Sequence, residues 1–381
     1  MERDTTQYPD FEFNMRELGG SMGDFGTLFP LAVGLIAVSR LDPTALFVMM
    51  GLANILLGLV YRLPMPLEPK KVIAVTAIAQ GWPAAMVTAS ALGLGVLWLL
   101  LVMTGLVSKL VEKIPTYLIR GIQLALGISL GMSAVEMMLP ELWLGALAIV
   151  IILLLRENRY APAAVVIMGL GVAIMLLRGE LSQGLDFGIG LPRFSVPKWS
   201  DIWQAMVQAG FAQIPLSITN AVLATATLIR DLFPEKPVTE RKLLFNMGVM
   251  NVVSSLFGGM PMCHGAHGLA GQYYFGARTG GASILEGLIE IILGIFLGRA
   301  LLAILTAFPM PLIGGMMLMV GIRLAKVATE LRRWPLYLAL LTAAISVALN
   351  MAVGFIVGLA AAYTVRWLIR RGTIQGDLQE V

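Results

Sequence analysis

Apolar runs long enough to cross a bilayer recur along the whole chain, and they constrain its fold more than any other feature. Two examples are Ala84–Val107 and Leu142–Leu155, and a spanning helix needs about 20 mostly apolar residues. Hydrophobic residues make up 58% of the sequence and charged residues only 13%, whereas soluble domains carry about 25% charged residues. The sequence therefore predicts an all-α polytopic membrane protein.

The rest of the composition argues against several classes of function. Cys263 is the only cysteine, which excludes an intrachain disulfide and any CxxC metal or redox site. The sequence pI is about 9.2, but no basic stretch interleaved with aromatic residues lies outside the apolar segments, so nucleic-acid binding is not expected. The polar start, Met1–Arg16, lacks the apolar region of a signal peptide. No nucleophile–base pair, metal cluster or phosphate loop appears, so neither an enzyme nor a cofactor is predicted.

Charged and Pro/Gly-rich joints divide the chain into fourteen candidate membrane spans. They lie at roughly 16–40, 44–62, 64–81, 84–108, 115–133, 139–156, 160–177, 199–230, 240–258, 260–275, 280–305, 309–326, 334–348 and 351–371. The only long connection is Arg178–Lys198. We therefore expect a tail at 1–15, a first seven-span repeat at 16–177, a linker at 178–198, a second repeat at 199–371 and a tail at 372–381.

Two ungapped self-alignments indicate an internal duplication. Met50–Met65 matches Met247–Met262 at a shift of 197 residues, with Asn54 over Asn251, and Pro115–Ile128 matches Pro309–Ile322 at a shift of 194. Glycine, asparagine and proline coincide as well as leucine, which chance similarity between apolar segments does not explain well. Because seven spans is an odd number, the second copy must be inverted in the membrane, as in many secondary transporters.

The lysine and arginine distribution predicts the orientation. With both termini in the cytoplasm, 20 of the 27 Lys and Arg residues fall on the cytoplasmic side and Lys70 and Lys71 fall within a span. The five on the opposite side are Arg40, Arg178, Arg193, Lys198 and Arg299. The positive-inside rule favours this arrangement in the inner (cytoplasmic) membrane.

The third and tenth spans are interrupted by helix-breaking residues. The third begins LPMPLEPKK (Leu63–Lys71) and the tenth begins GGMPMCHG (Gly258–Gly265), and proline cannot occupy a helix interior without breaking it. Each span should therefore be extended at first and continue as a half-helix, the first starting at Pro69 and the second near Ala266. Two half-helix N-termini that meet in a membrane make a site suited to an anion.

Lys70 and Lys71 lie at the start of the first half-helix, where a charge at bilayer depth costs about 2.5–3.5 kcal/mol. This cost predicts that at least one lysine contacts the anion, while Glu68 balances charge or couples protons. A structural ion pair between Glu68 and a lysine, or lysines that reach the cytoplasmic surface, are the alternatives.

Polar residues in two other spans are further candidates for the site. Asp24 and Thr27 lie on or beside a face of small residues in the first span, and Asp24 is a site residue, a coupling group or a backbone clamp. In the eighth span Gln213 and Ser217 share a helix face at i, i+4 around Pro215.

Cys263, His264 and Gly265 occupy the break in the tenth span. His264 is expected to donate to an anion or to cap the half-helix. His267, three residues further on, makes a metal site a formal alternative, but three ligands on non-helical backbone argue against it, and no metal is predicted. Glu286 and Glu290, one turn apart in the eleventh span, belong either to a proton path or to a contact between helices.

The motifs resemble those of the molybdate-transporter branch of the SulP (sulfate permease) superfamily over essentially 18–371. The resemblance rests on GGSMGDFGTLFPLAVGL (Gly19–Leu35), PMPLEPKKVIA (Pro64–Ala74) and PMCHGAHGLAGQYYFGARTGG (Pro261–Gly281), with FAQIPLSITNAVLA (Phe211–Ala224) as a weaker match. It implies the fold of the uracil/proton symporters, with a core domain that carries both half-helices and moves against a gate domain. It also implies a homodimer with a complete site in each subunit.

The chain departs from the family pattern at three positions. A glutamine is common where Glu68 stands, a non-basic residue where Lys70 stands and a glycine where His267 stands. Because the sequence ends about ten residues after its last predicted span, we expect no cytoplasmic STAS domain of the kind found in sulfate permeases, and this expectation favours the molybdate branch. We expect a proton-coupled transporter of a tetrahedral oxyanion, molybdate or tungstate. The alternatives are a sulfate transporter, an uncoupled anion channel, and a nucleobase or dicarboxylate carrier.

Overall fold

The computed structural model describes residues 9–105, 115–155, 163–179 and 187–371. The first part of the chain forms α1 (Met15–Ser21), η1 (Met22–Asp24), α2 (Phe25–Ser39), α3 (Pro43–Tyr61), β1 (Glu68–Pro69), α4 (Lys71–Gln80), α5 (Ala84–Thr104), α7 (Thr116–Met138), η2 (Leu139–Glu141), α8 (Leu142–Leu154) and α9 (Ala163–Leu177).

The second part begins with one long helical segment made of α10 (Trp199–Ala205), η3 (Met206–Gly210), α11 (Phe211–Leu216), η4 (Ser217–Ala224) and α12 (Thr225–Leu232). It continues with α13 (Glu240–Leu256), β2 (Met262–Cys263), α14 (Ala266–Tyr274), α15 (Gly280–Ala307), α16 (Met310–Lys326), η5 (Val327–Glu330), α17 (Arg333–Ala348) and α18 (Met351–Arg370). These helices agree with the predicted spans to within a few residues.

Among the described residues, six helical segments are long and apolar enough to cross a membrane. They are Pro43–Tyr61, Ala84–Thr104, Thr116–Leu154, Trp199–Leu232, Met310–Glu330 and Met351–Arg370. Shorter apolar helices include Lys71–Gln80 and Arg333–Ala348. The many apolar helices agree with a membrane protein.

Two predicted spans are less regular than expected. The first is interrupted by the 3₁₀ turn η1, which follows a run of glycines with low helix propensity. The eighth contains two π-helical stretches, η3 and η4, on either side of Pro215. Proline removes a backbone donor, and the wider π turns redistribute the hydrogen bonds around it.

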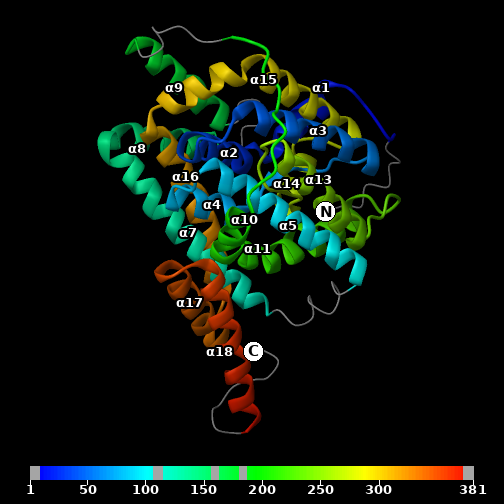
Figure 1. Ribbon diagram of the computed structural model, residues 1–381, viewed down its shortest axis with the longest axis vertical. Coiled ribbons are helices and arrows are strands. Elements are labelled where there is room, and N and C mark those ends of the chain that lie inside the picture. Colours follow the sequence, from blue (N-terminus) through cyan, green and yellow to red (C-terminus); the bar gives the residue numbers. More distant parts are fainter. Residues whose placement is uncertain (1–8, 106–114, 156–162, 180–186, 372–381) are drawn as a thin grey trace.

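The helices pack mainly in pairs that join segments far apart in the sequence. α3 lies against α15, α5 against α13, and α7 against α16, while α17 packs on both α7 and α18. In Figure 1, α17 and α18 lie at one end of the long axis and project from the rest of the molecule. There Tyr117, Leu118, Leu338 and Ala362 form a small hydrophobic cluster separate from the main core.

The second part of the predicted linker crosses the face of this helical body as extended chain. Residues 187–198 contain no helix, and their backbone binds two helices: Gly190 N–H donates to Ile295 O at 2.8 Å and Ser195 N–H donates to Leu256 O at 2.8 Å. In Figure 1 this green segment runs down the front of the molecule toward α10.

Glycines allow α3 and α15 to approach closely. A Cβ placed on Gly51 would lie 2.5 Å from Gly287 O, and one on Gly58 would lie 2.6 Å from Gly280 O. Small residues at such crossings are typical of membrane helices, because close backbone packing replaces the hydrophobic driving force.

We predict that Gly51→Ala destabilises the protein, because the new methyl group overlaps a backbone carbonyl that cannot move without shifting α15. Overpacking of this kind costs about 1–3 kcal/mol, and thermal unfolding in detergent should show a lower midpoint. Gly19→Ala is the matched control, since a Cβ at Gly19 meets nothing within 4 Å. Equal midpoints for the two variants would contradict this account of the α3–α15 contact.

Candidate functional site

The two predicted breaks lie side by side as a small antiparallel sheet. Glu68 in β1 pairs with Cys263 in β2, and Pro69 pairs with Met262. Lys70 N–H donates to Pro261 O at 2.9 Å, which extends the pairing to the start of α4. The two non-helical segments therefore satisfy part of each other's backbone hydrogen bonding, a requirement for irregular chain inside a membrane protein.

Both half-helices start from this sheet. α4 begins at Lys71, two residues later than predicted because Pro69 lies in the strand, and α14 begins at Ala266 as predicted. Because the strands pair, the two helix N-termini lie close together. The unsatisfied N–H groups and positive dipole ends of both helices thus point to one region.

Glu68 and Lys71 form a buried ion pair in this region. Lys71 Nζ lies 2.9 Å from Glu68 Oε2, and the side chains are 12% and 1% exposed. The carboxylate lies over the first turn of α14: a Cβ on Gly265 would be 2.7 Å from Oε2 and one on Gly268 would be 3.0 Å from Oε1. Glu68 therefore occupies the position at the α14 N-terminus that suits a negative charge, and Gly265 leaves the space for it.

Gln213 and Ser217 lie at the N-terminus of α4. Gln213 Oε1 accepts from Val72 N–H at 2.9 Å, and its Nε2 donates to Ser217 Oγ at 2.9 Å. Both side chains are buried. The two residues share a helix face, as predicted. Gln213 satisfies one of the free N–H donors at the start of the half-helix α4.

Lys70 points away from the Glu68–Lys71 pair. Its ammonium group lies 3.2 Å from Met247 Sδ and 5.3 Å from the centre of the Trp98 ring, and the side chain is fully buried. Lys70 is the extended residue that precedes the first helical residue, Lys71, and the two lysines enter different surroundings.

Of the remaining predicted site residues, two are buried beside the sheet and two have side chains that the structure does not describe. Cys263 and His264 are both buried, and the His264 ring meets the edge of the Tyr61 ring with centroids 6.0 Å apart. The side chains of Asp24 and Thr27 lie outside the described part. The backbone near Asp24 packs on α14, where a Cβ on Gly23 would lie 2.5 Å from Gly271 O.

Asn251 is a supporting residue that sequence reasoning did not select. Its Nδ2 donates to Met262 O at 2.7 Å and to Met247 O at 2.6 Å, and its Oδ1 accepts from Met262 N–H at 2.8 Å. Ser283 holds the backbone of the extended segment before β1 in the same way. Met65 N–H donates to Ser283 Oγ at 3.0 Å, and Ser283 Oγ donates to Met65 O at 3.3 Å. The match of Asn54 with Asn251 in the self-alignment was the only sequence signal.

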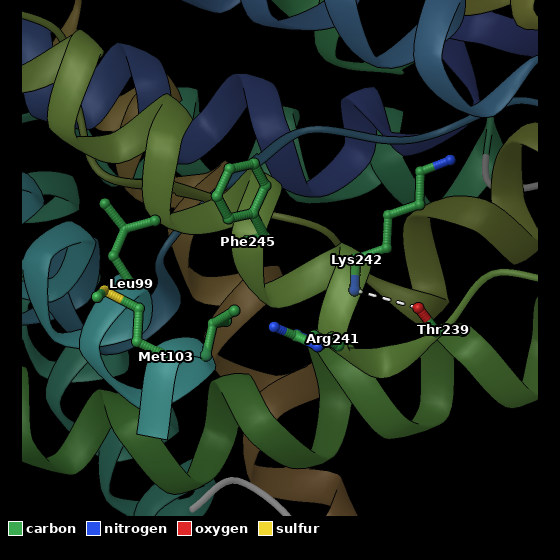
Figure 2. Close-up of a pocket in the computed structure, with 7 residues that line it drawn as sticks. Leu99, Met103, Thr239, Arg241, Lys242 and Phe245 are labelled. Carbon is green, nitrogen blue, oxygen red and sulfur yellow. Dashed lines mark hydrogen bonds between the residues drawn. The ribbon is translucent and has the colours of Figure 1, made fainter. Parts of the chain in front are cut away.

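Two of the cavities among the described helices have volumes of several hundred Å³. One, of about 660 Å³, is lined by the first turns of α14 and by η4 and α12, and includes His267, Asn220 and Asp231. Figure 2 shows the other, of about 590 Å³, where Arg241 and Lys242 at the start of α13 lie beside apolar side chains such as Leu99 and Phe245. Only the first cavity includes residues of a half-helix.

Known proteins match most of the chain. The family described as "Molybdate transporter of MFS superfamily" matches residues 16–130 and 205–324. Molybdate transporter 1 of Arabidopsis thaliana is 32% identical over 375 residues, covering 84% of this chain and 81% of that protein. Molybdate transporter 2 of the same plant is 32% identical over 386 residues, covering 87% and 82%.

The fold also has a solved counterpart. The transmembrane domain of the cyanobacterial bicarbonate transporter BicA aligns with a TM-score of 0.65 at 18% identity, covering 90% of this chain and 97% of that one. At this identity the likeness establishes the fold alone. The predicted resemblance to molybdate transporters is confirmed, and these relatives are transporters rather than enzymes. The chain is a multi-pass membrane protein that belongs to the molybdate transporter family.

Proposed function

We propose that this protein is a secondary transporter of a tetrahedral oxyanion, with molybdate as the principal substrate and tungstate as a second one. The observation that carries the proposal is the meeting of the α4 and α14 N-termini beside Lys71. An oxyanion has several acceptor oxygens, and it suits a place where two helix N-termini and one ammonium group converge. The names of the relatives favour molybdate.

In the proposed mechanism the oxyanion takes the place of the Glu68 carboxylate. Glu68 now provides the negative charge at the α14 N-terminus and neutralises Lys71. An incoming anion would pair with Lys71 and receive N–H donors from both half-helices, with Gln213, Ser217, Cys263, His264 and Gly265 around it. Thr27 is proposed to complete the site, and Asp24 is proposed as a coupling group. Lys70, beside Met247 and Trp98, does not contact the anion in this proposal but adds positive electrostatic potential to the site.

The proposed architecture is fourteen spans in two inverted seven-span repeats, at 16–177 and 199–371, joined by 178–198. Two pairs of helix contacts support it, because interchanging the two halves of the chain turns one contact of each pair into the other. The α3–α15 contact corresponds to α13–α5, and α8–α16 corresponds to α17–α7. A core domain with the half-helices would move against a gate domain of α7–α9 and α16–α18, which includes the separate cluster at α17 and α18. The homodimer and proton coupling remain part of this proposal.

A sulfate transporter is the second candidate, because sulfate has the same shape and charge as molybdate. Backbone N–H donors distinguish the two anions poorly. Competition by sulfate and tungstate against labelled molybdate uptake in proteoliposomes decides between them: displacement by tungstate but not by sulfate supports the molybdate assignment.

We predict that Lys71→Met weakens molybdate binding about ten- to a hundredfold, because one charge-assisted contact contributes about 1.5–3 kcal/mol. The single variant also leaves the Glu68 carboxylate buried without a cation, which lowers stability. Isothermal titration of purified protein measures the affinity, and thermal unfolding measures the stability.

The companion variants separate these two effects. Glu68→Gln removes the competing carboxylate and should tighten molybdate binding. The double variant Lys71→Met with Glu68→Gln should regain thermal stability but still bind weakly. Lys70→Met, which keeps the volume beside Trp98 and removes no direct contact, should weaken binding much less than Lys71→Met. Normal binding by Lys71→Met would mean that the helix N-termini hold the anion without the lysine.

We predict that both termini are cytoplasmic in the inner membrane. In a Cys263→Ser background, Arg371→Cys should react with a membrane-impermeant maleimide only from the cytoplasmic side, and Arg193→Cys only from the opposite side. Both residues are exposed. Labelling of Arg371→Cys in intact cells would contradict the orientation.

A further inference from the structure

Buried acceptor oxygens gather where α15 meets α3 and α14, away from the Glu68–Lys71 pair. Asn54 Nδ2 donates to Glu290 Oε2 at 2.8 Å, and Gln272 Nε2 donates to Glu286 Oε2 at 3.3 Å. All four side chains are at most 4% exposed. In the described part of the chain, Asn54 Oδ1, Gln272 Oε1 and Glu290 Oε1 accept no hydrogen bond. The cluster thus has more acceptors than donors.

The described charged groups on α1 and on the segments next to α3 and α14 are engaged elsewhere, and the side chain of Asp24 lies outside the described part. On α1, Glu17 accepts from Arg278 N–H and Thr279 N–H, and Arg16 donates to Gly276 O. Arg278 donates to Ala277 O and stacks on Tyr273, and Arg62 after α3 pairs with Asp10.

Three other titratable side chains on α3 and α14 make contacts away from Glu290. Tyr61 on α3 accepts from Asn246, and Tyr274 on α14 is exposed. His267 lines the cavity beside η4. The described hydrogen bonding of Glu290 consists of one neutral amide donor, from Asn54.

A carboxylate in this position is costly to keep charged. Burying an ion without a partner costs several kcal/mol, and a carboxyl group in such a place takes up a proton instead. A protonated carboxyl supplies one O–H donor, which the surplus acceptors require. Two carboxyl groups one helical turn apart also favour a single retained proton between them.

We propose that Glu290, assisted by Glu286 and Asn54, is the binding site for the proton that accompanies the anion. This inference rests on the proposed transport function and assigns its proton site. The described part of the chain holds no group of three His, Cys, Asp or Glu that fits a metal ion. Proton binding is therefore the chemistry that suits the cluster best. Coupling to sodium instead of protons is one of the outcomes that the test below distinguishes.

The contrast between Asn54 and Asn251 supports a special role for this cluster. The two residues match in the self-alignment, and Asn251 uses its amide to hold the backbone of Met262. Ser283 holds the corresponding Met65, which leaves Asn54 to bind a carboxyl group.

The cluster is connected to both half-helices. Gln272 belongs to α14, whose N-terminus forms the anion site. Ser283, one turn before Glu286 on α15, binds Met65 three residues before Glu68. A proton gained or lost at Glu290 can therefore change how α15 holds the two segments that carry the anion site.

The test compares Glu290→Gln with the wild type in proteoliposomes, using labelled molybdate. Glutamine keeps the shape and supplies N–H donors without titrating. We expect Glu290→Gln to bind molybdate and exchange it across the membrane like the wild type. It should lose accumulation driven by an acid-outside pH gradient. Glu235→Gln, at an exposed position, is the matched control and should accumulate normally.

Infrared spectroscopy of the purified protein tests the site without transport. The wild type should show the carbonyl band of a buried neutral carboxyl group, which Glu290→Gln lacks and Glu235→Gln retains. Absence of this band in the wild type, or normal pH-driven accumulation by Glu290→Gln, overturns the proposal. Accumulation that follows a sodium gradient instead also overturns it. A wild type that shows the band but binds no molybdate would refute the proposed function and leave the proton site standing.

Discussion

The pairing of two short extended segments is the interaction on which the rest of the site depends. A bilayer offers no water to backbone N–H and C=O groups, so non-helical chain needs partners within the protein. β1 and β2 provide them to each other, while Asn251 and Ser283 tie these segments to α13 and α15. Because these bonds are made, α4 and α14 can begin within the helical body and direct their N-termini to one place.

Charge near these N-termini is arranged in two separate environments. Glu68 and Lys71 neutralise each other where the half-helices begin, whereas Lys70 is buried against Trp98 and Met247. A buried ion pair contributes little net stability once desolvation is counted. Its presence at a helix N-terminus therefore fits the proposed role in anion binding better than a role in strengthening the fold.

α15 links the parts of the molecule that transport would have to coordinate. Its glycines pack on α3, and Ser283 and Glu286 reach the segment before β1 and the half-helix α14. Rigid helices with close backbone contacts transmit small shifts rather than absorb them. A change at Glu290 would thus reach both halves of the proposed anion site through one element.

The sequence by itself determined the membrane class, the approximate helices and the two half-helices, because apolar length and the positions of proline and glycine act locally. Pro69 and Gly265 interrupt the helices through their own backbone properties, and this effect does not depend on how the rest of the chain packs. Only the tertiary structure decided that Lys71 rather than Lys70 meets Glu68, that this carboxylate lies over Gly265, and that Asn54 binds Glu290. These outcomes depend on which helices become neighbours. Glu68 meets Gly265, and Asn54 meets Glu290, only because long-range packing sets the distance and direction between the segments that carry them.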